Sequence, residues 1–219
     1  MNKHLFLYGG GPPFTSNMAK KFVALTEKTN KPVSILFVER TGWREYIADY
    51  TDQLRKFGFE EFHVLPLPST PISEAVNAIN NSSGIIINGG DTNKYADYIV
   101  DTPISDAIQK IYDAGGPVAG FSAGALISPE VCIISGKDNE QSEFQQRNGL
   151  GLLSTVIVAV HFSEWNDKAH LRAASAKYPS CTNYGIDEGT CIYMVNGEIA
   201  DTEGAGVYSL KDNILYKLN

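Results

Sequence analysis

Residues 120–127, with the sequence GFSAGALI, contain a serine between two glycines in the pattern Gly-x-Ser-x-Gly. The motif follows the apolar run PVAGF at 117–121 and opens a segment that can be helical, SAGALI. On a sharp strand-to-helix turn, the glycines let the backbone bend and a substrate approach, while the serine Oγ projects from the turn. The N–H of Ala123 would point from the helix start towards a developing oxyanion. The pattern favours Ser122 as a nucleophile; a serine that only caps a helix is the alternative.

A serine nucleophile needs a base, and the chain has four histidines. His161 ends the apolar run LLSTVIVAV, which places it at the carboxyl end of an expected strand, on the same edge as Ser122. His4 and His63 lie within expected strands and are interpreted as packing or surface residues. His170 falls in an expected helix, where we expect it to be solvated. His161 is therefore favoured as the base, the alternative being a strand-end histidine bonded to backbone.

A histidine base needs a carboxylate that orients it, and the sequence GIDEG at 185–189 follows another expected strand. Either Asp187 or Glu188 could reach an imidazole from there. Glu188 stands next to Gly189, where the chain can turn it towards the site, and both could also be ordinary turn carboxylates. The order Ser, His, acid differs from the Ser, acid, His of the α/β-hydrolases and disfavours a lipase or esterase.

Short β-branched or aromatic runs must position these side chains. Up to about residue 127 they alternate with helix-like segments, at residues 4–8, 33–38, 62–67, 84–88 and 117–121. Runs this apolar, joined by helices, indicate parallel strands buried on both faces. The expected fold is therefore α/β, a doubly wound, mostly parallel sheet flanked by helices. The carboxyl ends of its strands would gather residues 9–11, 39–40, 89–91 and Ser122 at one edge.

The clearest helix is expected at 43–57, with an apolar stripe of period 3.6 formed by Trp43, Tyr46, Ile47, Tyr50, Leu54 and Phe57. Gly58 is placed to cap it, and Thr70–Pro71 are interpreted as the N-cap and first residue of the next helix. After residue 128 further short strands are predicted, including a hairpin with Asn196-Gly197 as a type I′ turn. We expect them to extend the same sheet, so that residues 1–219 form one α/β hydrolytic domain.

Composition excludes several classes of protein. The 219 residues are 43% hydrophobic and 20% charged, an ordinary globular balance, and the net charge of −7 argues against nucleic acid as the main partner. Three cysteines without CxxC spacing predict reduced thiols in a cytoplasmic protein. No apolar stretch approaches the length of a membrane span. Neither HExxH, a Cys/His cluster nor a dinucleotide-binding glycine motif occurs, so no metal and no cofactor are expected.

Four motifs together resemble a known family of serine peptidases. GFSAGA, INGGDTNKY, the HF of residues 161–162 and GIDEGT are similar to those of the family that includes α-aspartyl dipeptidase and cyanophycinase, within the class I glutamine amidotransferase-like superfamily. The resemblance runs from LFLYGGG to about residue 200 and implies a flavodoxin-like sheet. It also implies roles for single residues: Ser122 as nucleophile, His161 as general base, Glu188 as acid with Asp187 in reserve, and the N–H groups of Ala123, Gly90 and Gly89 as the oxyanion hole.

The sequence departs from this family after the HF pair. Members that act next to aspartate carry arginines there, whereas this chain has HFSEWNDKAHLRAA, with Lys168 and Arg172 as the tentative substrate-binding cations. Glu164, Trp165 and Asp167 could favour a cationic residue instead. A solvated helix start and face is the alternative for all of these side chains.

The sequence thus predicts a serine-type peptidase that hydrolyses short peptides or isopeptides, dipeptidase-like, through an acyl-enzyme. An amidase or acyl transferase of the same superfamily is one alternative. A non-catalytic small-molecule-binding protein is the other. The sequence does not indicate an oligomeric state.

Overall fold

The computed structural model describes residues 1–27 and 29–219. Strands and helices alternate through the N-terminal part in the predicted order: β1 His4–Tyr8, α1 Ser16–Thr26, β2 Val33–Val38, α2 Trp43–Lys56, β3 Phe62–Leu67, α3 Ile72–Asn80, β4 Gly84–Ile87, α4 Thr92–Tyr95, a π-helical turn Ala96–Val100, α5 Ile104–Asp113, β5 Val118–Phe121 and α6 Ala123–Leu126. All five strands predicted before residue 127 are therefore confirmed.

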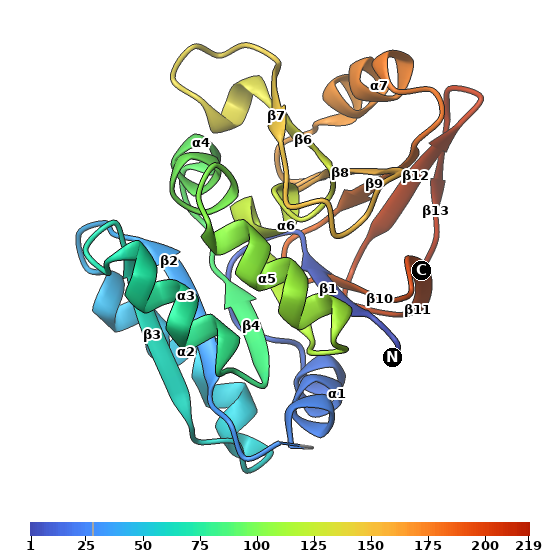
Figure 1. Cartoon of the computed structure of the whole chain (residues 1–219). Helices are drawn as coiled ribbons and strands as arrows, with labels where there is room; N and C mark the ends of the chain where they lie inside the picture. The colour runs from blue at the N-terminus through green and yellow to red at the C-terminus, as the bar shows by residue number, and fades with distance from the viewer. Residues whose placement is uncertain (28) are drawn as a thin grey trace.

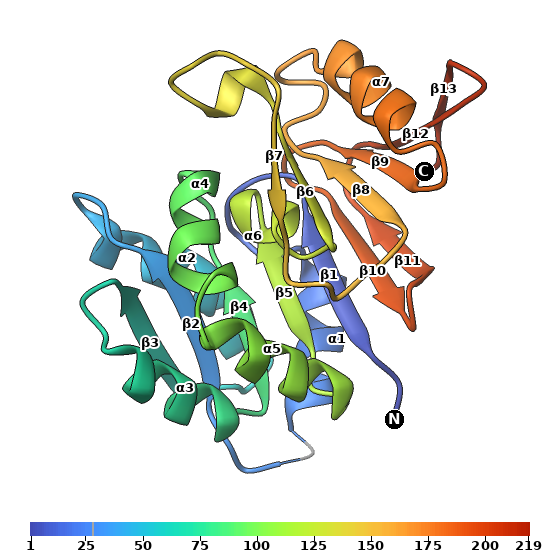
Figure 2. The same ribbon diagram turned by 45° about the horizontal axis from the view of Figure 1, so that its top comes forward.

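These strands form the main part of a seven-stranded sheet of order β11-β10-β1-β5-β4-β2-β3. The five strands β1 to β5 run parallel, and β10 (Cys191–Val195) and β11 (Glu198–Glu203) extend the sheet in antiparallel orientation beside β1. Helices cover both faces (Figures 1 and 2). The doubly wound α/β arrangement predicted from the apolar runs is thus confirmed.

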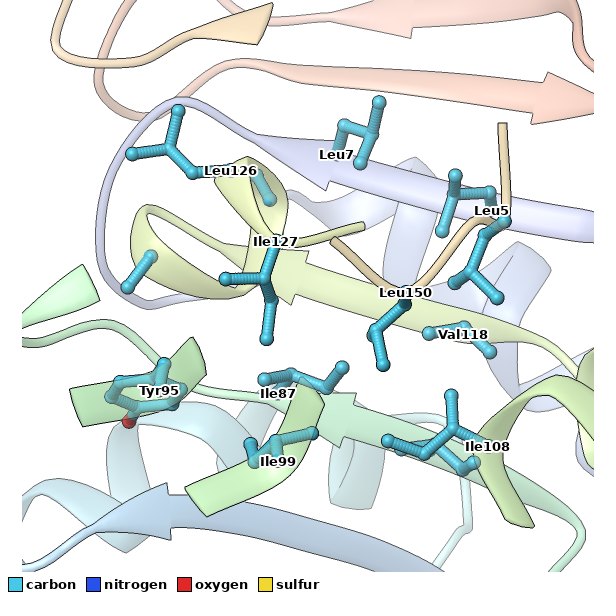
Figure 3. Close-up of a cluster of buried hydrophobic side chains, with 14 of the residues drawn as sticks. Leu5, Leu7, Ile87, Tyr95, Ile99, Ile108, Val118, Leu126, Ile127 and Leu150 are labelled. Carbon is cyan, nitrogen blue, oxygen red and sulfur yellow. The ribbon is translucent and has the colours of Figure 1, made fainter. Parts of the chain in front are cut away.

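The alternation of side chains along the strands separates two apolar clusters, one on each face of the sheet. Leu5 and Leu7 of β1 pack into the cluster that contains α3 and α5, whereas Phe6 and Tyr8 pack into the cluster beneath α1 and α2. Figure 3 shows part of the first cluster, in which side chains of β1, β4 and β5 meet those that follow the α6 turn. Burial on both faces explains why the central strands β1, β4 and β5 carry apolar residues or glycine at nearly every position.

The C-terminal part corrects the expectation that its strands extend the same sheet. Only β10 and β11 join it; β8 (Val156–Ala159), β9 (Thr182–Ile186), β12 (Val207–Lys211) and β13 (Ile214–Lys217) form a separate four-stranded sheet, and β6 (Val131–Ile134) pairs with β7 (Gln145–Asn148). The four-stranded sheet has its own helix, α7 (Lys168–Lys177), and its own apolar cluster, which includes Phe162, Leu171 and Leu210. One face of this sheet is buried in that cluster, whereas Val156, Val158, Ile186 and Val207 on its strands pack into the larger cluster of the main sheet.

Other local predictions are corrected in detail. Tyr46 is 46% exposed, because the stripe of α2 is buried only over Tyr50 and Leu54, and the Arg40 guanidinium lies over the Tyr46 ring. The third helix begins at Ile72 with an extended Pro71 before it, one residue later than predicted. The hairpin at Asn196-Gly197 is confirmed, with positive φ at both residues as a type I′ turn requires.

Candidate active site

Ser122 occupies the sharp turn between β5 and α6. Its backbone has φ 50° and ψ −109°, a conformation that L-residues rarely adopt and that surrounding structure must hold in place. The Ser122 N–H donates to the carbonyl of Tyr8 at 3.0 Å, and the Ser122 carbonyl accepts from the N–H groups of Ala125 and Leu126, both at 2.9 Å. The turn is therefore fixed from both sides by β1 and α6.

The two glycines of the motif are required by close packing around this turn. A Cβ on Gly120 would lie 2.4 Å from the Gly124 carbonyl oxygen, and a Cβ on Gly124 would lie 2.3 Å from the Ile87 carbonyl oxygen. Neither contact is possible for a real side chain. Gly-x-Ser-x-Gly thus lets α6 pack directly against β4 and β5, as Figure 3 shows around Ile87, Leu126 and Ile127.

Three of the predicted site residues form a continuous hydrogen-bonded chain. Ser122 Oγ lies 2.9 Å from His161 Nε2, and His161 Nδ1 lies 2.6 Å from Glu188 Oε1. His161 follows β8 with a positive φ of 48°, and its N–H donates to the Gly9 carbonyl at 2.7 Å. The glycine turn after β1 therefore contributes to the site by holding the histidine backbone, a contact that the sequence did not indicate.

The structure distinguishes the two neighbouring carboxylates. Glu188 contacts His161, whereas Asp187 is buried and its Oδ1 accepts the Ser163 N–H at 2.9 Å. In return, Glu164 Oε1 accepts the Glu188 N–H at 3.2 Å. These reciprocal bonds join the loop after β8 to the loop after β9. Asp187 thus fixes the backbone next to the histidine, and Glu188 faces the imidazole.

Of the three N–H groups predicted to form an oxyanion hole, two are available. Within residues 1–27 and 29–219, the N–H groups of Ala123 and Gly90 have no acceptor, whereas that of Gly89 donates to the Tyr50 hydroxyl at 3.3 Å. Gly89 lies against the nucleophile turn, because a Cβ on it would be 3.1 Å from the Ser122 Cβ. The arrangement leaves Ala123 and Gly90 free to donate to a substrate oxygen.

Trp165, which the sequence suggested only as an influence on substrate charge, is a direct neighbour of His161. Its ring stacks on the His161 imidazole, with centroids 4.4 Å apart and planes at 25°. The Lys137 ammonium donates to the Trp165 carbonyl. A stacked indole restricts rotation of the imidazole. The stacking depends on a turn, residues 161–167, that no periodicity reveals.

A cavity of 870 Å³ opens beside the site, lined by Gly90, the start of α4 and the β6–β7 connection. Asp138 of that connection accepts a hydrogen bond from the Thr92 hydroxyl at 2.5 Å. Burial raises the pKa of Asp138 to about 6, with the nearby carboxylates of Asp91 and Asp167 adding to the rise. The cavity that begins at Gly90 is therefore polar and rich in carboxylates.

The predicted substrate-binding cations lie elsewhere. Arg172 donates to the Asn213 carbonyl at 3.3 Å, in the β12–β13 turn, and lines a separate cavity there. Lys168 begins α7 and has no hydrogen bond or ion pair to Ser122 or His161 in the described part of the chain. The structure thus brings neither residue beside the nucleophile.

The other histidines have structural surroundings. His4 lies 2.8 Å from the Tyr193 hydroxyl, and His63 is exposed on β3, which agrees with packing and surface roles. The expectation that His170 is solvated is wrong: it is half-buried against Phe144, and burial lowers its pKa. The cause is the β6–β7 connection, which covers this side of α7.

In residues 1–27 and 29–219, no group of three or more His, Cys, Asp or Glu side chains is arranged to hold a metal ion. Among the helices described, none combines the length and the apolar character that crossing a bilayer requires.

Solved structures of peptidases share this fold. A peptidase from an acI-B1 Actinobacterium aligns with 100% of this chain and 94% of its own, with a TM-score of 0.72 and 22% sequence identity. A putative peptidase E protein from Listeria monocytogenes EGD-e aligns with 93% of this chain and 98% of its own, with a TM-score of 0.65 and 19% identity. The architecture is therefore that of the peptidase E-like α/β proteins.

Sequence comparison gives the family. The sequence model of peptidase family S51 matches residues 5–202. A cyanophycinase from Synechococcus elongatus is 30% identical over 149 residues, which are 65% of this chain and 46% of that protein. A cyanophycinase from a Nostoc species is 31% identical over 144 residues, 64% of this chain and 48% of that protein. The chain belongs to peptidase family S51, and it spans about half the length of the curated relatives it matches.

Proposed function

We propose that this chain is a serine-type peptidase that hydrolyses short peptides through an acyl-enzyme, with Ser122, His161 and Glu188 as its catalytic triad. The observation that carries the proposal is the unbroken chain of two hydrogen bonds from Ser122 Oγ through the imidazole to the Glu188 carboxylate. A nucleophile bonded to a base, and a base oriented by a third group, is the arrangement that activates serine. Membership of a peptidase family supports the same reaction.

The geometry suggests how each step proceeds. His161 Nε2 takes the proton of Ser122 Oγ as the oxygen attacks the scissile carbonyl, and Glu188 stabilises the resulting imidazolium. The N–H groups of Ala123 and Gly90 donate to the oxyanion of the tetrahedral intermediate. The imidazolium then protonates the leaving amine, and an ester remains on Ser122. Water, deprotonated by His161, hydrolyses this ester and releases the acid.

The surroundings of the nucleophile favour short substrates. Ser122 is 9% exposed, at the edge of the main sheet beneath the loops that follow β6 and β8. An extended chain of a folded protein would have to pass these loops, whereas a peptide of a few residues fits the cavity that begins at Gly90. We further propose that residues 1–219 form one domain. The three free cysteines favour a cytoplasmic location, where thiols stay reduced.

The test is hydrolysis of a panel of dipeptides, tripeptides and isopeptides by the wild type and by Ser122→Ala. Loss of the Oγ nucleophile should lower kcat/KM by about 10³-fold or more, while the unchanged fold keeps its Tm. Thr92→Ala, which removes a buried hydroxyl that donates to Asp138 without touching the reacting atoms, is the matched control and should retain hydrolysis. Hydrolysis that persists in Ser122→Ala would contradict the assignment.

A further inference from the structure

Gly89 and Gly90 form the start of the loop between β4 and α4, and the Gly90 N–H is one of the two groups proposed to bind the oxyanion. Two consecutive glycines can adopt many backbone conformations, so the sequence of the loop does not by itself orient this N–H. An oxyanion hole lowers the barrier most when its donors are already aimed before the charge develops. Contacts from side chains outside the two glycines must therefore fix the peptide between them.

Two buried tyrosine hydroxyls make these contacts. The Tyr95 hydroxyl donates to the Gly89 carbonyl at 3.1 Å and accepts the Val38 N–H at 3.2 Å, so it links the end of β4 to the end of β2. The Tyr50 hydroxyl accepts the Gly89 N–H at 3.3 Å. Tyr95 is 0% exposed and Tyr50 is 2% exposed. Side chains of α4 and α2 thus hold both polar groups of Gly89.

The hydrogen bond from Tyr95 bears directly on the Gly90 N–H. The Gly89 carbonyl and the Gly90 N–H belong to one peptide unit, which is trans and planar, so the two groups point in opposite directions. Fixing the carbonyl on the side of Tyr95 therefore aims the N–H away from that side. A carbonyl that accepts a hydrogen bond also polarises its peptide unit, which makes the N–H a stronger donor.

Packing keeps both tyrosine rings in place. A Cβ on Gly90 would lie 3.0 Å from Cε2 of Tyr95, so this ring lies directly against the loop. Figure 3 shows the Tyr95 ring within the apolar cluster on one face of the sheet. The Tyr50 ring packs edge-on against Phe121, the residue before the nucleophile, with centroids 5.0 Å apart and planes at 87°. Burial raises the pKa of both phenols, that of Tyr50 to about 12, so both hydroxyls keep their protons at neutral pH.

We propose that Tyr95, assisted by Tyr50, is a positioning residue that holds the Gly89–Gly90 peptide so that the Gly90 N–H donates to the oxyanion, a role that rests on the proposed peptidase function. In the described part of the chain, neither tyrosine hydroxyl bonds to a side chain of the triad, so both act through the loop. Without these bonds the peptide can rotate about either glycine and turn its N–H away from the substrate.

The kinetic test is Tyr95→Phe, which keeps the ring and removes only the hydroxyl. Loss of one neutral hydrogen bond should lower kcat for peptide hydrolysis by about 10-fold, less than the loss of an oxyanion donor, because the peptide still visits the correct orientation. KM and the pKa values of the pH–rate profile should stay those of the wild type, because the triad is untouched.

Two other tyrosines provide the comparison. Tyr50→Phe leaves the Gly89 carbonyl bonded and frees only its N–H, so kcat should fall by about 2-fold to 3-fold. Tyr112→Phe is the matched control, since Tyr112 is a buried tyrosine of α5 that lines a separate cavity with Lys3. Its kcat should equal that of the wild type.

The rate of labelling by a fluorophosphonate separates orientation of the loop from loss of folded protein. The phosphoryl oxygen of the reagent takes the place of the oxyanion, so the rate constant for the Ser122 adduct should fall about 10-fold in Tyr95→Phe. A partly unfolded sample would lower the amount of adduct and leave the rate constant unchanged. The reagent needs no peptide, so this measurement applies even if the wild type hydrolyses none of the peptide panel.

NMR of the Gly89 and Gly90 amides tests the restraint of the loop without any reaction. In Tyr95→Phe the Gly90 resonance should shift or broaden, and the Gly89 amide proton should exchange with solvent about 10-fold faster than in the wild type. If the wild type neither hydrolyses peptides nor reacts with the fluorophosphonate but both amides respond, the peptidase proposal fails and the restraint stands. Amides that do not respond would overturn the role of Tyr95. In an active protein, Tyr95→Phe with the kcat and labelling rate of the wild type, or equal losses in Tyr112→Phe, would overturn it whatever the amides show.

Discussion

The two halves of the candidate active site are held in different ways. Ser122 is 9% exposed and stands on a turn packed between β1, β4 and β5 of the seven-stranded sheet. His161 and Glu188 follow β8 and β9 of the four-stranded sheet, and the Glu188 side chain is 54% exposed. Packing of backbone on backbone fixes Ser122. Hydrogen bonds between two loops fix His161 and Glu188.

This difference separates stability from activity. Backbone contacts in a close-packed core cannot yield to an added methyl group, so changes at the nucleophile turn should destabilise the fold. The loop residues bury little apolar surface, so changes there should lower the rate at small cost in stability. The predictions below compare the two halves directly, from the largest expected effect to the smallest.

Removing either of the two adjacent carboxylates on the loop after β9 should have a different effect: one loss should lower the rate, the other the stability. Glu188→Ala removes the partner of His161 Nδ1 and should lower kcat by about 10³-fold, with little change in Tm because the side chain is half exposed. Asp187→Ala leaves the Ser163 N–H without its acceptor and should lower the free energy of unfolding by about 1–3 kcal/mol. Peptide kinetics and urea unfolding of both variants measure the contrast. Equal loss of kcat in the two would contradict the assignment of Glu188 as the acid.

Two glycines, one in each half, should differ in the cost of an added methyl group. Gly124→Ala places a Cβ 2.3 Å from the Ile87 carbonyl oxygen and should lower the free energy of unfolding by about 3 kcal/mol. Gly189→Ala meets nothing within 4 Å and should cost only about 1 kcal/mol, the strain of its φ of 62°. Chemical unfolding of both variants tests the prediction. If Gly124→Ala were as stable as Gly189→Ala, the turn at Ser122 could accommodate a methyl group, and the prediction would be wrong.

Asp138 lies between the halves, on the connection that bonds to Thr92 of α4. Burial raises its pKa from 3.8 to about 6, so the folded protein binds more protons than the unfolded chain between these pH values. Its contribution to stability therefore falls as pH rises from about 4 to 6 and stays low above 6. The free energy of unfolding of Asp138→Asn should be higher than that of the wild type by about 1–2 kcal/mol at pH 7.5. Below pH 4 the two proteins should have the same free energy of unfolding. Urea unfolding of both proteins at the two pH values measures this difference. The same difference at both pH values would contradict the claim that protonation of Asp138 causes it.

Much of the fold could be predicted because the main sheet is buried on both faces. The runs at residues 4–8, 33–38 and 84–88 are mostly apolar, so they cannot lie on a solvated surface. Their length and their spacing between helix-like segments indicate parallel strands. Strand β7, with the sequence QQRN, was missed because it carries no apolar residue. The separate four-stranded sheet was missed because pairing partners depend on contacts between distant segments, which no local pattern encodes. Whether residues 1–219 form one domain stays a prediction.

The site could be predicted as far as its motifs reach. Gly-x-Ser-x-Gly indicated the turn at Ser122, and the end of an apolar run indicated His161. The sequence left Asp187 and Glu188 open because the two are neighbours, and only the Ser163 and His161 contacts separate them. The sequence did not indicate the hydrogen bond from the His161 N–H to the Gly9 carbonyl or the stacking of Trp165 on His161, since neither contact follows from a local periodicity.

The most direct measurement is covalent labelling of the wild type with a fluorophosphonate, followed by peptide mapping in a mass spectrometer. An activated serine reacts at its Oγ, whereas an ordinary serine does not. The account predicts one adduct, on Ser122, formed much more slowly in His161→Gln, and absent from Ser122→Ala. An unlabelled protein, or an adduct on another residue, would contradict the claim that Ser122 is the nucleophile of this peptidase.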